Sequence, residues 1–122
     1  MNVVFGDEIK HIMGDRYVTL ELDTFEYMPG TVPVTAYAVL SPDEFSLQSV
    51  EIIQQLLPVH EALIRNYKKQ NFDFCVQTIP HLVGKIDSFM DEFYAVILKR
   101  IRDQQANPVE NWSHIVTGED NG

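Results

Sequence analysis

The chain has 122 residues, 45% of them hydrophobic and 22% charged, and its 18 acidic and 9 basic side chains give a formal net charge of −9. This length and apolar content suffice for one self-supporting domain, which excludes disorder of the whole chain. The negative charge opposes binding to nucleic acid or to an anionic membrane surface, so we predict neither as a partner.

Cysteine usage and hydropathy restrict the compartment. Cys75 is the only cysteine, which excludes an intramolecular disulfide and a zinc site built from several thiolates. No apolar run approaches the roughly 20 residues needed to cross a bilayer, and no basic and apolar leader precedes the first strand. We therefore expect a cytoplasmic protein, with Cys75 as a small core residue of an apolar helical stripe.

The first 40 residues predict a small antiparallel sheet. Residues 16–22 and 32–40 alternate apolar and polar side chains, the pattern of half-buried strands. Met28-Pro29-Gly30-Thr31 between them is typical of a tight turn, which makes the two strands a hairpin. A change of phase near Asp23-Thr24 indicates a bulge. Residues 3–5 are apolar, and whether they add a third strand is left open.

The strongest local signal is the start of a helix at residue 42. Ser41-Pro42-Asp43-Glu44 combines a hydroxyl N-cap, a proline at the first helical position and a glutamate that completes a capping box. An apolar face continues in one helical phase to about residue 69. Because the phase survives Pro58, we predict a single helix that bends there rather than two helices.

A second apolar stripe predicts a second long helix, over residues 72–101. Its phase survives Pro80 and Gly84. The predicted fold class is therefore α+β: a small N-terminal antiparallel sheet followed by two long antiparallel helices. We expect one domain over residues 1–105 and a loose tail over residues 106–122, whose composition is polar.

Both helical stripes are wider than one small sheet would cover. We therefore expect a homodimer in which the helical hairpin buries its apolar faces against a second copy. The side chains expected to form this dimer face are Ile53, Leu57, Ile64, Ile86, Met90, Phe93 and Ile97.

The acidic side chains are concentrated in the N-terminal half. Two of them are spaced to share one face of the first predicted strand, and two more lie near its ends. Such a face suits a basic protein surface or a divalent cation, although a simply solvated face is the default explanation. The candidate partner surface comprises Asp15, Glu21, Asp23 and Glu26.

His60 is the most informative histidine, because the helical phase places it on the apolar face of the first helix. A buried imidazole needs a hydrogen-bond partner, and in a pocket it could bind a ligand or sense pH. We therefore consider a pocket around His60 and Tyr67. The alternative is a structural histidine that bonds a carbonyl group.

Asp87 and Asp91 share one side of the second predicted helix, with Glu92 beside them. Carboxylates four residues apart repel each other, a cost that a Mg²⁺ site would justify. A small magnesium-dependent hydrolase, with Glu51 or Glu61 on the facing helix, is therefore the alternative function. A solvated helix face explains the same residues.

No phosphate-binding loop, nucleophile elbow or dinucleotide fingerprint occurs in the chain. We accordingly expect no cofactor and no catalytic residue. The preferred function is a non-catalytic acidic interaction or assembly module that acts as a homo-oligomer.

Overall fold

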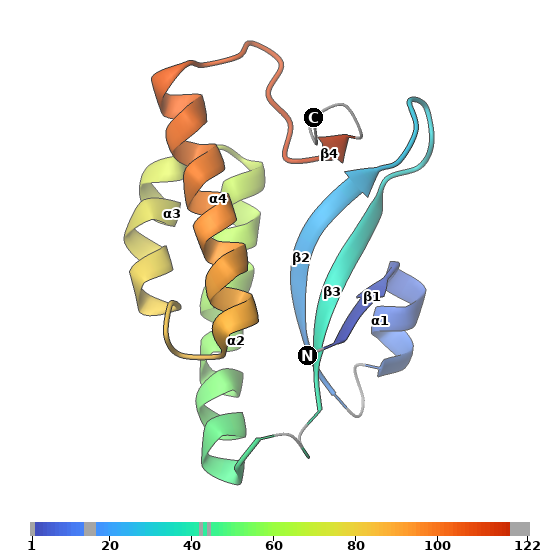
Figure 1. The fold of residues 1–122 in the computed structure, drawn as a ribbon, viewed down its shortest axis with the longest axis vertical. Helices are drawn as coiled ribbons and strands as arrows, with labels where there is room; N and C mark the ends of the chain where they lie inside the picture. The colour runs from blue at the N-terminus through green and yellow to red at the C-terminus, as the bar shows by residue number, and fades with distance from the viewer. Residues whose placement is uncertain (1, 14–16, 42, 44, 118–122) are drawn as a thin grey trace. The chain divides into compact units, whose positions relative to one another are not determined.

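The computed structural model describes residues 2–13, 17–41, 43 and 45–117 (Figure 1). The chain divides into two compact units: Met1–Ser46 with Ser113–Gly122, which we call the sheet unit, and Leu47–Trp112, which we call the helical unit. The predicted α+β class is confirmed. Among the described residues, no helix is both long enough and apolar enough to cross a membrane.

The sheet unit holds four described strands in the order β1-β3-β2-β4, with bounds Asn2–Phe5 for β1, Val18–Glu26 for β2, Val34–Leu40 for β3 and Val116–Thr117 for β4. The hairpin of β2 and β3 is antiparallel, and β1 adds antiparallel to β3 as a third strand. The prediction of a purely antiparallel sheet was wrong, because β4 pairs parallel to β2. Two residues are too few to show a strand pattern in sequence.

The turn between β2 and β3 has the predicted chemistry. The Thr31 N–H donates to the Met28 carbonyl oxygen at 3.0 Å, with Pro29 and Gly30 between them. Gly30 has a φ of +83°, as the third position of a type II turn requires. The predicted bulge is also confirmed, since the register of β2 against β3 shifts between Glu21 and Thr24.

A short helix that the sequence did not predict, α1 (Asp7–Met13), packs against β1 and β3. The Tyr37 hydroxyl on β3 donates a hydrogen bond to Asp7, and Lys10 Nζ lies 5.7 Å from the centre of the Tyr37 ring. Burial, and then the bond to Asp7, raises the pKa of Tyr37 far above its ordinary value. These contacts place α1 on the face of the sheet to which Tyr37 points.

Helix α2 (Leu47–Lys68) is continuous through Pro58, as predicted. Its start was predicted wrongly, at residue 42. Ser41 Oγ does accept a bond from the Asp43 N–H at 3.4 Å, but Phe45 and Ser46 are not helical, so this cap stabilises only a local turn. Pro42 and Glu44 lie outside the described residues.

The second long helix was also predicted wrongly, because the stretch forms two α-helices. Their bounds are Phe72–Thr78 for α3 and Ser88–Ala106 for α4, with a 3-10 turn, Ile79–His81, after α3. Pro80 has no N–H to continue the ladder, and Gly84 takes a φ of +79°. Asp87 is extended and its side chain caps α4. Figure 1 shows α3 and α4 as separate helices, and α3 packs against both α2 and α4.

The described part of the C-terminal segment makes specific contacts. The Gln104 side chain bonds both the N–H and the carbonyl oxygen of Val109, at 3.1 and 3.2 Å. The Trp112 ring stands edge-on to Tyr67 and Phe72, with ring centres 5.2 and 5.4 Å away. Residues 118–122 lie outside the description, and the predicted domain boundary at residue 105 stays a prediction.

Candidate functional site

His60 lies in the core of the helical unit with no solvent exposure, as its place on the apolar face predicted. Its Nδ1 is 2.8 Å from the Tyr94 hydroxyl oxygen, and its ring packs against Phe93 and Tyr94. Burial, and then the negative charges of Asp91 and Asp87, raises the pKa of Tyr94 far above its ordinary value. The phenol therefore stays protonated and able to donate, and His60 sits where solvent does not reach it.

Two of the three acidic residues of the alternative metal site make hydrogen bonds at the start of α4. Asp87 Oδ1 accepts the Met90 N–H at 2.9 Å as the N-cap, and Asp91 Oδ1 accepts the Gly84 N–H at 2.8 Å. Glu92 is exposed. Within the described part of the chain, no group of three or more histidine, cysteine, aspartate or glutamate side chains is placed to hold a metal ion.

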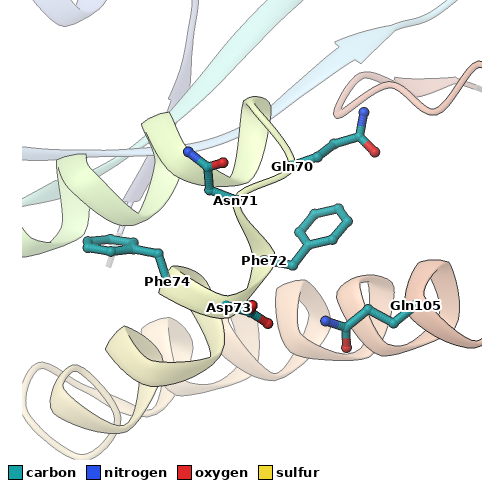
Figure 2. A pocket seen from close by; sticks show the side chains of 6 residues that line it. All are labelled: Gln70, Asn71, Phe72, Asp73, Phe74 and Gln105. Atoms are coloured by element: carbon teal, nitrogen blue, oxygen red, sulfur yellow. The ribbon is translucent and has the colours of Figure 1, made fainter.

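A pocket of about 370 Å³ lies where the turn after α2 meets the end of α4. Figure 2 shows Gln70, Phe72 and Gln105 on one side of the chain segment and Asn71 and Phe74 on the other. Good ligand sites bring a few polar groups together on one point, which these amide side chains do not do. Asp73 completes the lining. Amides and one carboxylate could hold a polar ligand, but this arrangement selects no reaction.

Neither His60 nor Tyr67, around which a pocket was predicted, lines this pocket. His60 is enclosed, and Tyr67 is buried behind Phe72, with their ring centres 6.4 Å apart. Phe72 and Trp112 cover Tyr67 on the side of the pocket. The Tyr67 ring therefore supports the pocket wall and does not line the pocket.

The predicted acidic surface is only partly described, because Asp15 lies outside the described residues. Glu21, Asp23 and Glu26 all belong to β2 and are half-buried. The bulge between Glu21 and Thr24 interrupts the alternation that was expected to align Glu21 with Asp23. Glu26 lies farther along β2, at its pairing with β4.

The side chains of the predicted dimer face are mostly inside the chain. Leu57 and Ile86 are half-buried. The other five are buried, namely Ile53, Ile64, Met90, Phe93 and Ile97. Five of the seven side chains are thus covered within the chain, and the homodimer stays a prediction.

The most exposed large apolar side chains of the sheet unit, Tyr27, Met28 and Val32, lie in and beside the turn that closes the hairpin. Phe5 is opposite Ala36 and Phe25 is opposite Val34, so both rings project from one face and flank β3. The rings are 6.4 Å apart, and Tyr27 stacks on Phe25 at 6.3 Å. We call Phe5, Phe25, Tyr27, Met28 and Val32 the hairpin patch.

Four side chains of the hairpin patch are exposed. Tyr27 is 63% exposed, Met28 66% and Val32 84%, and Phe5 at the edge strand is 46% exposed. Aromatic and methionine side chains are the types enriched in protein interfaces. The patch was not predicted from the sequence, although the phase change at the bulge and the apolar residues beside the Pro-Gly turn were visible signals.

The charge of the chain is carried by the unit that holds the patch. The sheet unit, with its residues outside the description counted from the sequence, has ten acidic and two basic side chains, a net charge of −8. The helical unit has eight acidic and seven basic side chains, a net charge of −1. The unit that holds the hairpin patch therefore carries most of the net negative charge of the chain.

Comparison with known proteins adds no relative. No family model, curated protein or solved structure matches the chain.

Proposed function

We propose that the chain is a non-catalytic protein-interaction module that binds a basic partner through the hairpin patch of its acidic sheet unit. The carrying observation is the exposure of Tyr27, Met28 and Val32 within a unit of net charge −8. The patch offers large apolar anchors, and the charge around it favours basic partners and repels acidic ones.

The charge also bears on self-association. A second copy would bring another sheet unit of net charge −8 against the patch, and like charges across an interface cost binding free energy. The homo-oligomer expected through the helical hairpin would need side chains that are buried, among them Met90 and Ile97. A different, basic protein is therefore the better candidate partner.

The test is selection of binding peptides from a phage library of random sequence on the immobilised full chain. We expect enrichment of peptides that combine lysine or arginine with an aromatic or branched apolar residue. Tyr27→Ser with Met28→Ser should abolish their binding, because it removes both anchors without touching the core. Leu47→Ser is the matched control, since Leu47 is 77% exposed on α2 and outside the patch.

Two results would contradict the proposal. One is enrichment that survives the Tyr27→Ser and Met28→Ser variant, and the other is the absence of any enriched basic peptide. Sedimentation velocity adds an independent readout. A dimer that persists in the Tyr27→Ser and Met28→Ser variant would instead support the homodimer predicted through the helical hairpin.

A further inference from the structure

We infer that the outer edge of β1 accepts a basic, extended segment of the partner as an added strand. This inference rests on the proposed function and names the chemistry of the partner. Within the described residues β1 lies at one end of the sheet order and pairs only with β3. Its outward N–H and C=O groups are therefore available to another chain.

The ladder identifies which backbone groups face outward. The Gly6 N–H donates to the Thr35 carbonyl oxygen at 2.8 Å. Hydrogen-bonded pairs alternate along an antiparallel ladder, so the polar groups of Val4, two residues earlier, also face β3. Those of Val3 and Phe5 face the open edge. The same two residues carry exposed side chains, at 37% and 46%.

Apart from its length of four residues, strand β1 lacks the sequence features that usually protect an edge from pairing. Its sequence, Asn2–Phe5, contains no proline or charged residue, and its register against β3 shows no bulge. The other end of the sheet differs, because β2 has a bulge and the carboxylates of Glu21 and Asp23, and β4 pairs with its last two residues. Added pairing is therefore favoured at β1.

The two faces beside β1 specify an alternating partner. On one face lie Val3 and Phe5, and the Phe5 ring continues into the hairpin patch through Phe25. On the other face lies α1, which carries Asp7 and Glu8 in its first turn, next to β1 in the chain, and Lys10 and His11 in its last turn. A strand that alternates apolar and basic side chains would place the apolar ones beside Phe5 and the basic ones beside α1. A second copy of β1 has no basic side chain to offer.

The experiment uses the full chain, labelled with ¹⁵N, and a short synthetic peptide of alternating lysine and valine. Binding should slow amide hydrogen exchange at Val3 and Phe5 and leave Val4 unchanged, because the Val4 N–H already bonds β3. A peptide of alternating glutamate and valine should not bind. If the lysine peptide binds without slowing exchange at Val3 and Phe5, the edge is not its site.

Val3→Pro provides the matching variant, because it removes an outward N–H and leaves the bonds to β3 in place. It should weaken peptide binding at least about tenfold, whereas Val3→Thr, which keeps the N–H, should bind as the wild type does. Unchanged exchange at Ala38 and Val39 would verify that β3 stays intact. Equal affinity of Val3→Pro and wild type overturns the strand-addition inference, while loss of binding in Tyr27→Ser with Met28→Ser would still uphold the proposed function.

Discussion

The Tyr94 hydroxyl oxygen and Nδ1 of His60 lie 2.8 Å apart, and neither side chain has measurable solvent exposure. The two residues come from different helices, α4 and α2, and their rings also pack edge to face. A buried polar pair of this kind stabilises a fold only while both members are present, because either one left alone is a desolvated group without that bond. The pair is thus a structural link within the helical unit.

Tyr94→Phe tests this link, since it removes the hydroxyl group and keeps the ring. We expect the free energy of unfolding to fall by about 1–3 kcal/mol, measured by urea denaturation at neutral pH. His60→Leu combined with Tyr94→Phe should cost less than the sum of the two single variants, because no buried partner is left behind. An unchanged urea midpoint for Tyr94→Phe would show that the bond contributes nothing.

Cys75 should be unreactive in the folded chain. The thiol is fully buried, and Sγ donates to the Leu63 carbonyl oxygen at 3.7 Å. Burial raises its pKa to about 11, which leaves little thiolate at pH 8. Reaction with a disulfide reagent should therefore be much slower than in urea-unfolded chain, and its rate should follow opening of the structure. A native rate close to the unfolded rate would contradict this prediction.

Stability should fall at alkaline pH. Burial raises the pKa of both Tyr37 and Tyr94 above the ordinary value of about 10. Above that ordinary value the unfolded chain loses protons that the folded chain keeps, so stability is full below it and decreases as the pH rises further. Urea midpoints measured from pH 8 upward should decline above about pH 10, and less steeply in Tyr37→Phe. A flat profile would refute the prediction.

Local signals in the sequence predicted the hairpin, whereas the strand pairings between residues far apart in the chain could not be predicted from it. The Pro29-Gly30 turn and the bulge depend on neighbouring residues, so both were visible in the pattern. The pairing of Asn2 with Val39 joins residues far apart in the chain, and its short strand has no pattern long enough to identify. The two-residue strand β4 has the same limitation.

The helices show why an unbroken apolar phase does not prove an unbroken helix. Ile79, Leu82 and Met90 are all buried, as the stripe predicted, although a 3-10 turn and a loop connect α3 to α4. A 3-10 turn, like an α-helix, returns a side chain to the same side after three or four residues, so the pattern continues as far as Leu82. Beyond the loop, Met90 is buried by the packing of α4 and not by a shared helical phase. Pro80 and Gly84 were the local signals of the break, whereas Pro58 alone was tolerated in α2.

Of the proposed binding surface, only its acidic character was predicted from the sequence. The acidic excess of the N-terminal half was readable directly from composition. The hairpin patch was not, because it combines Phe5 of β1 with Phe25 of β2 and with Tyr27, which follows β2 and stacks on Phe25. Only the register of the three strands brings Phe5 and Phe25 onto one face. Periodicity likewise identifies the apolar side of a helix without showing what covers it, so the predicted homodimer and its face stay predictions.

Asp87 distinguishes a structural role for the acidic residues of α4 from a metal-binding one. Asp87→Ala removes the N-cap bond to the Met90 N–H and should lower the free energy of unfolding by about 1 kcal/mol, measured by urea denaturation. Glu92→Ala, at an exposed neighbouring position, should change the midpoint little and serves as the control. Millimolar MgCl₂ should leave the melting temperature of the wild type unchanged. A large magnesium-dependent rise in melting temperature that Asp91→Ala abolishes would instead support the hydrolase alternative, because a bound ion stabilises the folded state that holds it.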